Sequence, residues 1–512
     1  MNFIKMLYIL FAAICLFISQ ACSEREVDPS LGPIELVDTT ANVNGEKPVI
    51  NTGYDEAYRP QIHYTPARNW VNDPNGLVYA NGTYHLFYQY NPKGNDWGNM
   101  SWGHATSTDL MHWVEQPVAL TRDKLGDVFS GSAVVDKENT AGFGKNIIIA
   151  IYTAASTTQQ QCIAYSTDNG VTFKKYSGNP VIPSTSADFR DPKVFWYEKD
   201  KKWVMVLATG YGHTIELWSS LDLKTWKKQS AFSSPIDRCN KGQWECPDLF
   251  PLQYKGKEKW IMLVSVNPGG PVSGSGTMYF IGSFDGSRFM ADKDFDYPLW
   301  LDYGSDNYAG VSWNNLEGRR VYIAWMNNWN YAGQVPASPW RSAFTLPRYL
   351  ELISYQNKPL LVSKVVTEIE TLADKWHDVI DGEIGTSEAY QLQIKVSTTE
   401  DWTLTLYNAY GEQYVMNYQA FNRRIVANRG AKTGKTDFNL NFSIPSIGMP
   451  INTLNDEVTL DIYVDRSSVE TLTSSGTAAM TNVVYPKSIY SKVELDIPCS
   501  RMRARPLRRI WR

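Results

Sequence analysis

Short stretches of alternating apolar and polar residues, each ending at a polar turn, run through the first two-thirds of the chain. Because successive side chains of a β-strand point to opposite faces, this alternation predicts strands rather than helices. The stretches come in pairs, as one strand, a turn and a second strand. Five pairs are recognisable, at 76–79 with 84–90, 130–135 with 147–152, 194–197 with 203–208, 249–252 with 260–266, and 309–313 with 321–325.

The five pairs are copies of one repeat. Their equivalent positions lie 57 to 62 residues apart, at Asp73, Gly131, Asp191, Asp248 and Gly310. A second repeated feature is an aspartate followed by an aromatic residue, seen at Asp109, Asp168, Asp222 and Asp285. Repeats of short strands and turns are typical of β-propeller blades, although this repeat is long enough to require long loops. The pattern predicts a five-bladed β-propeller at 56–350.

After about residue 365 the repeat stops and separate alternating strands take its place. This pattern is typical of a β-sandwich, which we expect over 376–512, joined to the propeller by a linker at 351–375 that includes a short helix-like pattern at 367–375. The predicted fold class is therefore all-β, a five-bladed β-propeller followed by a C-terminal β-sandwich. The sandwich strands are expected at 390–396, 402–407, 413–417, 458–464 and 493–496.

The N-terminus lacks this alternation. Lys5 precedes an apolar segment at 6–17, the arrangement of a signal peptide, which we expect at 1–21. The polar, aperiodic segment that follows, 22–55, is expected to form a tether.

Residues 18–22 resemble a lipobox, with a small residue before the cleavage point and Cys22 as the lipidated residue. A plain secretory peptide with an incidental cysteine is the alternative. Acidic residues follow Cys22, as in the surface-export signal of some Gram-negative lipoproteins. The expected location is therefore the outer membrane or cell surface, with contact to the membrane only through the lipid anchor.

Composition narrows the function classes. A chain of 512 residues suits two domains, and its net charge of −4, without a basic stripe, argues against nucleic acid as a partner. The arginine-rich end, 501–512, is expected to be a closing strand rather than a binding tail. The histidines form no HExxH-like cluster, so we expect neither a metal site nor a cofactor. The cysteines beyond the tether show no disulfide framework: Cys162, Cys239, Cys246 and Cys499.

Three acidic motifs stand at the starts of repeats: NDPNG at 72–76, RDP at 190–192 and ECPD at 245–248. Proline restricts its own backbone and that of its neighbour, so each carboxylate should lie on a rigid bend. The innermost strands of a propeller face one axis, which would bring the acids together. Cleaving a glycosidic bond requires such converging carboxylates. Capping of turns is the alternative, and it is the favoured interpretation for the four repeated aspartates named above.

At this point the motifs resemble a known family. The blocks WVNDPNG at 70–76, FSGS at 129–132, FRDP at 189–192 and WECPD at 244–248 are similar to those of glycoside hydrolase family 32, which includes invertases, inulinases and levanases. The block YVDRSSVE at 463–470 resembles the C-terminal sandwich of that family. The valine in the first block replaces the more usual methionine.

The resemblance implies retaining hydrolysis of β-fructofuranosides, with a β-fructan or fructo-oligosaccharide as substrate. It makes Asp73 the nucleophile, Glu245 the general acid and then base, and Asp191 the stabiliser of the transition state. Arg190 beside Asp191 should keep that acid charged, and the flanks of Glu245 should favour its protonated form.

The resemblance also places residues around the fructose: Asn72, Gln89, Trp97, Phe129, Ser130, Arg190 and Trp325. For Trp97 and Trp325, packing in the core is an equally open interpretation. Asp302 is expected to touch the aglycone side.

Two other functions remain open. A surface glycan-binding protein would keep the fold without catalysis, although the presence of all three acids argues against it. A fructosyltransferase would pass the fructosyl group to a sugar instead of water. The sequence does not decide between endo and exo action, between β-2,6 and β-2,1 linkages, or whether sucrose is cleaved.

Overall fold

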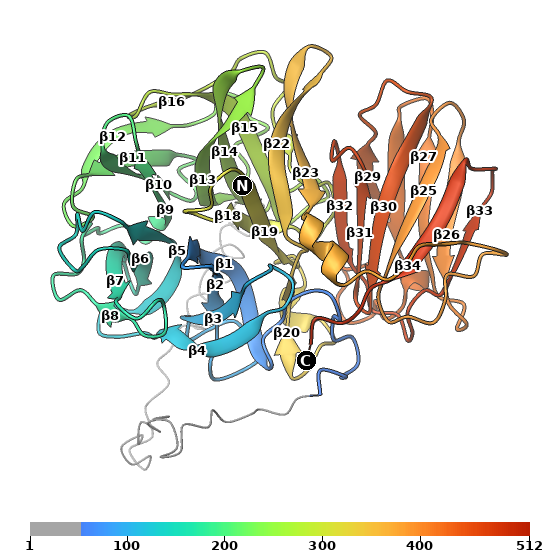
Figure 1. The fold of residues 1–512 in the computed structure, drawn as a ribbon, viewed down its shortest axis with the longest axis horizontal. Helices are drawn as coiled ribbons and strands as arrows, with labels where there is room; N and C mark the ends of the chain where they lie inside the picture. The colour runs from blue at the N-terminus through green and yellow to red at the C-terminus, as the bar shows by residue number, and fades with distance from the viewer. Residues whose placement is uncertain (1–52, 512) are drawn as a thin grey trace, which may run out of the picture. The chain divides into compact units, whose positions relative to one another are not determined.

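The computed structural model describes residues 53–511 and consists almost entirely of β-strands (Figure 1). The expected signal peptide, Cys22 and nearly all of the expected tether lie outside the described residues. Among residues 53–511, none of the helices is both long and apolar enough to cross a membrane.

The first five sheets follow one another along the chain, and each starts with its innermost strand. The first contains β1 (Asn69–Ala80), β2 (Thr83–Tyr90), β3 (Ser101–Ser107) and β4 (Val114–Leu120), and the second β5 (Asp127–Asp136), β6 (Ile147–Ala155), β7 (Gln159–Ser166) and β8 (Lys174–Lys175). The third contains β9 (Arg190–Tyr197), β10 (Lys202–Ala208), β11 (Ile215–Ser220) and β12 (Lys227–Phe232).

The fourth sheet contains β13 (Gln243–Tyr254), β14 (Lys257–Asn267), β15 (Gly276–Phe284), β16 (Phe289–Ala291) and the short β17 (Leu299–Trp300). The fifth contains β18 (Tyr308–Ser312), β19 (Arg320–Met326), β21 (Ala343–Phe344), β22 (Arg348–Tyr355) and β23 (Lys358–Val365). Between β19 and β21, the 3-10 turn η1 (Ala332–Gln334) precedes β20 (Trp340–Arg341), which pairs in parallel with β1.

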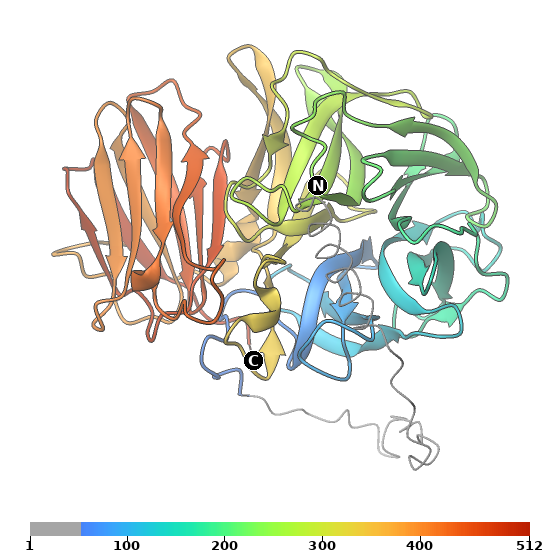
Figure 2. The same ribbon diagram turned by 180° about the vertical axis from the view of Figure 1, so that it is seen from behind.

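The innermost strands form a closed ring, since β1 contacts β5, β5 contacts β9, β9 contacts β13, β13 contacts β18 and β18 contacts β1. Figures 1 and 2 show the five sheets arranged around this ring from opposite sides. The sequence prediction of a five-bladed propeller is confirmed. The apolar alternation explains it, because adjacent sheets pack face to face through buried side chains such as Val134, Met205 and Phe250.

Two further sheets form the C-terminal sandwich. One contains β24 (His377–Asp378), β25 (Tyr390–Ser397), β30 (Glu457–Asp465), β31 (Ser468–Thr473), β32 (Ala479–Val483) and β34 (Arg501–Pro506). The other contains β26 (Trp402–Tyr407), β27 (Gln413–Gln419), β28 (Arg424–Arg429), β29 (Ile444–Pro450) and β33 (Lys492–Leu495). Their facing side chains, among them Leu392 and Met416, form one core. The arginine-rich end pairs with β25 as β34, which confirms the expected closing strand.

The segment between the two domains differs from the prediction. Residues 351–375 were expected to be a linker, but most of β22 and all of β23 belong to this range and complete the fifth sheet. The polar loop at Gln356 and Asn357 turns one strand into the other, with both residues in the left-handed backbone region. The helix-like pattern becomes the 3-10 turn η2 (Thr367–Thr371).

Buried charges join the propeller to the sandwich. His63 Nδ1 lies 2.7 Å from Asp465 Oδ2, and its Nε2 lies 2.7 Å from Glu470 Oε1. Arg348 donates hydrogen bonds to Glu470 and, at 2.8 Å, to Asp302. All five side chains are almost completely buried, so this cluster is a fully desolvated ion network. We call it the interface network.

The charges of the interface network stabilise one another. Burial alone would lower the pKa of His63, but the two carboxylates raise it to about 9. Burial alone would raise the pKa of Glu470, but Arg348 and His63 lower it to about 2. Each charged group therefore has a partner of opposite sign.

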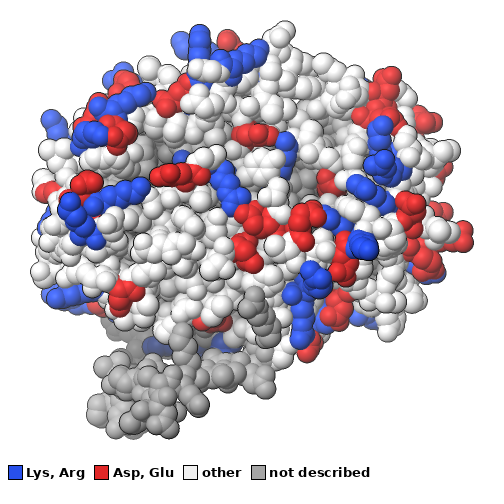
Figure 3. Space-filling view, in the orientation of Figure 1, with Lys and Arg blue, Asp and Glu red and all other residues white. Residues whose placement is uncertain are grey.

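Charged side chains of both signs are also mixed on the surface. On the face shown in Figure 3, basic and acidic side chains are interspersed, which fits a net charge of −4 and gives no broad basic patch on that face.

Candidate active site

Each innermost strand carries a β-bulge near its start. The register of the ladder shifts between Val71 and Pro74 in β1, between Phe129 and Gly131 in β5, and between Glu245 and Asp248 in β13. Similar shifts occur after Arg190 in β9 and after Tyr308 in β18. A bulge redirects side chains out of the regular alternation. The three acidic motifs lie at these bulges, as the prediction of rigid bends required.

Three of the bulges use the left-handed backbone region without glycine. The φ angles are 64° at Asp191, 45° at Cys246 and 54° at Ala309. Such conformations cost of order 1–3 kcal/mol each and persist only where the surrounding structure holds them. Their occurrence at equivalent positions of successive blades indicates that the inner rim of the propeller is shaped for the side chains it presents.

Cys246 links the three acidic motifs directly. Its backbone N–H donates to Asp191 Oδ2 at 2.9 Å. Its Sγ lies 3.6 Å from Asp73 Oδ2 and 3.7 Å from Asp191 Oδ2. Because Cys246 follows Glu245 in the chain, the acids of blades one, three and four meet within one small region. The convergence expected from the repeat is therefore present.

Asp73 is held by two donors. Ser130 Oγ donates to its Oδ2 at 2.6 Å and Asn72 Nδ2 to its Oδ1 at 3.0 Å. Burial raises the pKa of Asp73 above its usual value, and the neighbouring Glu245 adds to this rise, while the two hydrogen bonds oppose it. The donors therefore favour the ionised form and fix the direction of both carboxylate oxygens.

Burial raises the pKa of Asp191 to about 7, although Arg190 beside it acts in the opposite direction. The carboxylates of Glu245 and Asp73 add to the rise. The expectation that Arg190 would keep Asp191 charged is therefore wrong. Burial and the two neighbouring carboxylates raise the pKa of Asp191 by more than Arg190, whose Nε is 3.9 Å away, lowers it.

Glu245 is positioned by a cation and a phenol. Arg190 Nε donates to Glu245 Oε1 at 3.0 Å, and the hydroxyl of Tyr308 donates to Oε2. Arg190 is itself fixed by Asp188 and by Gln243, whose Oε1 accepts from Nη2 at 3.0 Å. The carboxyl group of Glu245 remains partly exposed to the pocket. It can therefore exchange a proton with a bound molecule.

The acids line a cavity of about 270 Å³ at the inner rim of the propeller. Trp97 reaches over it from a loop and is 51% exposed, so the core-packing alternative for this residue is wrong. The structure brings together most of the predicted residues, since the cavity is lined by Asn72, Asp73, Gln89, Trp97, Phe129, Ser130, Arg190, Asp191 and Glu245.

Two predicted substrate contacts lie elsewhere. Asp302 is buried in the interface network, where it accepts hydrogen bonds from Arg348 and from the backbone N–H of Thr481 at 2.8 Å. With 1% of its surface exposed it cannot reach a ligand, and the expected contact on the aglycone side is wrong. Trp325 is also fully buried and packs behind Trp329, so the core-packing alternative holds for it.

Three cavity residues were not predicted: Gln243, Asn267 and Trp329. Gln243 stands two positions before Glu245 on the same strand, and this spacing of two could have revealed it. It is paired with Asn267 across the hairpin, which only the register shows. Trp329 follows β19 on a loop whose course the alternation pattern does not give.

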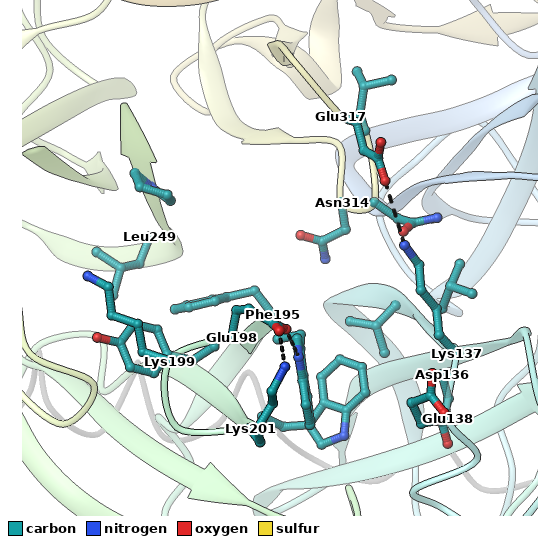
Figure 4. A pocket seen from close by; sticks show the side chains of 18 of the residues that line it. Asp136, Lys137, Glu138, Phe195, Glu198, Lys199, Lys201, Leu249, Asn314 and Glu317 are labelled. Carbon is teal, nitrogen blue, oxygen red and sulfur yellow. Dashed lines mark hydrogen bonds and ion pairs between the residues drawn. The ribbon is translucent and has the colours of Figure 1, made fainter. Parts of the chain in front are cut away.

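A second, larger cavity of about 740 Å³ lies at the opposite ends of the innermost strands (Figure 4). Its mouth carries salt bridges, including Lys137 with Glu317 at 3.9 Å and Lys201 with Glu198. None of the three motif acids lines it. The volume of a cavity therefore does not identify the candidate active site in this fold, because the three motif acids line the smaller cavity.

Asp248, the last residue of the third motif, lies apart from the other acids. It is buried and lies 3.3 Å from the Nζ of Lys193, and it accepts hydrogen bonds from the N–H and the hydroxyl of Ser312. It therefore has a structural role within the ring of innermost strands.

Within residues 53–511, no group of three or more histidine, cysteine, aspartate or glutamate side chains is arranged to hold a metal ion. The repeated aspartates of the turns bond locally, as the capping interpretation expects. Asp222, for example, accepts from the N–H groups of Lys224 and Thr225.

Comparison with known proteins covers almost the whole described chain. Residues 63–364 match the glycosyl hydrolases family 32 N-terminal domain, and residues 359–500 match its C-terminal counterpart. A levanase of Bacillus subtilis is 43% identical over 90% of this chain and 72% of its own length. An extracellular exo-inulinase of Aspergillus niger is 40% identical over 85% of this chain and 91% of its own length.

Solved structures agree with the sequences. The crystal structure of an exo-inulinase from Aspergillus awamori is 37% identical, with a TM-score of 0.83 over 90% of this chain and 100% of that one. A β-fructofuranosidase from Schwanniomyces occidentalis, complexed with fructosyl-erythritol, is 30% identical, with a TM-score of 0.79 over 88% of this chain and 98% of that one. From its motifs, its fold and these matches, the chain belongs to glycosyl hydrolase family 32 and is a glycosidase.

Proposed function

We propose that this protein is a retaining hydrolase of β-fructofuranosidic bonds that removes fructose from the ends of fructan chains. The observation that carries the proposal is the meeting of Asp73, Asp191 and Glu245 around Cys246 in one cavity. The relatives named levanase and exo-inulinase support a fructan as the substrate.

The surroundings of the acids support the following roles. Asp73, with a donor on each oxygen, is the nucleophile, because those hydrogen bonds favour its charge. Glu245 is the general acid and base, because it is partly exposed and its two oxygens are oriented by Arg190 and Tyr308. Asp191 accepts hydrogen bonds from the sugar hydroxyls.

In the first step, an Asp73 oxygen bonds to the anomeric C2 of fructose while the bond from C2 to the leaving oxygen breaks and Glu245 gives that oxygen a proton. In the second step, Glu245 takes a proton from water, whose oxygen bonds to C2 and releases Asp73. Two inversions give net retention.

One carboxyl group of the cavity, that of Asp191, can hold a proton near neutral pH. Like charges raise the pKa of a buried carboxyl group, because ionising one carboxyl group close to another is unfavourable. Burial raises the pKa of Asp191 to about 7, and the neighbouring carboxylates of Glu245 and Asp73 add to this rise. Binding of a substrate places the leaving oxygen nearest Glu245, where the proton is used.

The size of the cavity supports action at chain ends. About 270 Å³ is just below the roughly 300–1,000 Å³ of typical ligand pockets and has room for few sugar units. An endo-acting enzyme would need an open cleft on both sides of the cleaved bond.

We also propose that the protein is exported and held at the cell surface by lipid on Cys22. The apolar segment 6–17 and the residues before Cys22 support this. Replacing Cys22 with alanine should move the protein from the membrane fraction to the soluble fraction. An unchanged distribution would reject lipidation.

The direct test is product analysis. Protein lacking residues 1–22 is incubated with levan, inulin and sucrose in the presence of a chelator, with Asp73→Asn as the control. Free fructose as the first product supports the proposal, whereas a ladder of oligosaccharides would show endo action. Binding of fructan without any product would identify a glycan-binding protein, and products longer than the substrate would identify a transferase.

A further inference from the structure

Trp329 forms part of the wall of the substrate cavity and packs on two buried tryptophans. Its ring packs on Trp70, with centroids 5.8 Å apart, and on Trp325, with centroids 4.8 Å apart. Trp70 Nε1 in turn donates to Asn72 Oδ1 at 2.7 Å. A displacement of Trp329 would therefore change the shape of the cavity wall, whereas the two donors to Asp73, Ser130 and Asn72, lie on other strands.

Two residues further along the chain, Tyr331 is buried against the sandwich. Its hydroxyl donates to Asp306 Oδ1 at 2.5 Å and accepts from Arg429 Nη2 at 3.0 Å. Its ring meets Phe442 edge to face, with centroids 5.1 Å apart. Arg429 and Phe442 belong to the sandwich, so the loop that carries Trp329 is anchored to the other domain.

The anchor is a closed set of bonds. Arg429 Nη1 donates to Asp306 Oδ2 at 2.7 Å, and its guanidinium lies over the rings of Tyr331 and Phe442, at 4.9 and 4.1 Å from their centroids. The backbone N–H of Val483 also donates to Asp306. Arg429 and Asp306 are fully buried. A buried pair with satisfied partners holds one geometry, because any other leaves a charge without a partner.

The sandwich reaches the same loop at a second place. Asn439 Nδ2 donates to the carbonyl oxygen of Asn330 at 3.1 Å and to Gln334 Oε1 at 2.6 Å. On the propeller side, the backbone N–H of Trp329 donates to Ser275 Oγ at 3.1 Å. The loop is therefore fixed between the two domains on either side of Tyr331.

We propose that Arg429, Asp306 and Tyr331 are positioning residues for Trp329, through which the sandwich domain sets the affinity of the substrate cavity. This inference rests on the proposed function, since it takes the cavity of Asp73 as the sugar site. Trp329 contacts substrate before and during the reaction, so its displacement weakens both states alike. Such a loss raises KM and leaves kcat nearly unchanged.

The test begins with Tyr331→Phe, which keeps the ring and removes the hydroxyl. We expect KM for fructan to rise about threefold to tenfold, the effect of losing one or two buried hydrogen bonds, with little change in kcat. Tyr390→Phe is the matched control. It removes an equally buried hydroxyl, bonded to the carbonyl oxygen of Tyr490 at 2.7 Å inside the sandwich, and should leave KM unchanged.

A double-mutant cycle separates positioning from general loosening. In a Trp329→Ala background, Tyr331→Phe should cause no further rise in KM. Asn439→Ala, which removes the second contact with the loop, should raise KM in the same way and serves if Tyr331→Phe does not fold.

An unchanged KM in Tyr331→Phe and Asn439→Ala, or an equal rise with and without Trp329, would overturn the inference. Inactivity of the wild-type protein would instead count against the proposed function.

Discussion

The substrate cavity and the interface network both gather charged side chains inside the protein, but they do so in opposite ways. At the interface, the cations His63 and Arg348 lie between carboxylates. The pKa of each cation is raised and that of Glu470 is lowered, so each shift favours the charged form. In the cavity, three carboxylates face one arginine, and burial with mutual repulsion raises the pKa of Asp73 and Asp191.

The arrangement of charges differs because one region stabilises the fold and the other supports a reaction. Alternating charges in a dry interface are satisfied only in the folded arrangement, so they fix how two domains meet. Crowded like charges are unfavourable in the empty site and become useful when a reaction needs a proton donor and a nucleophile side by side. The same residue types therefore support the fold in one region and chemistry in the other.

The largest expected effect is loss of turnover on removing a cavity acid. Asp73→Asn should lower kcat by about 10³-fold or more, because no covalent intermediate can form. Glu245→Gln should affect fructan as severely but spare the first step with an activated aryl fructoside, whose leaving group needs no proton. Steady-state kinetics on both substrates checks this, and substantial fructan turnover by Asp73→Asn would refute the assignment.

A second substitution tests the interface network. Glu470→Gln leaves Arg348 and His63 without a full counter-charge and should destabilise the fold by about 3–5 kcal/mol. The kcat of the protein that remains folded should be unchanged. Denaturant unfolding measures the loss. Lys199→Gln, which breaks an exposed pair with Glu258, is the control and should have little effect.

A pH series sharpens the contrast. Because the pKa of His63 is raised to about 9 in the folded state, from an ordinary value near 6.5, its stabilisation is complete below about pH 6.5. It should fall by on the order of 3 kcal/mol as pH rises through 9. His63→Gln should flatten this part of the stability profile. A profile equally steep in the variant would show that other groups cause it.

The smallest effect is a gain in stability on substitution, opposite in sign to that of Glu470→Gln. A carboxyl group with a raised folded pKa binds its proton more tightly in the folded state, so stability falls as pH rises from about 4 to 7. Asp191→Asn should therefore stabilise the protein at pH 8 by about 1–2 kcal/mol while lowering kcat more than it raises KM. Thermal unfolding at pH 4 and pH 8 tests this, and a loss of stability at pH 8 would contradict the comparison.

Much of the architecture follows from local patterns. The inner strands were predictable because their alternation and turns repeat, and the convergence of Asp73, Asp191 and Glu245 followed from the place of all three motifs near the starts of inner strands. The left-handed bulge residues Cys246 and Ala309 were not predictable, because neighbouring blades hold these conformations and local propensity opposes them.

Other features depend on contacts between distant parts of the chain. Asp302 resembles a surface acid in the sequence, but its partners are Arg348 and Thr481, which lie 46 and 179 residues away. Trp325 and Trp329 are only four positions apart in the sequence. Only the fold shows that Trp329 faces the cavity while Trp325 is buried behind it. Strand patterns carry no information on such pairings.

The most direct test of the account is to identify the atom that attacks the sugar. Glu245→Gln is mixed with an activated aryl fructoside, quenched in acid and digested for peptide mass analysis. Without the general base, the second step is slow and the intermediate should accumulate. We expect a fructosyl ester on the peptide carrying Asp73, with fructose of retained configuration in the wild-type reaction. A peptide map without this adduct, together with inverted product, would contradict the account.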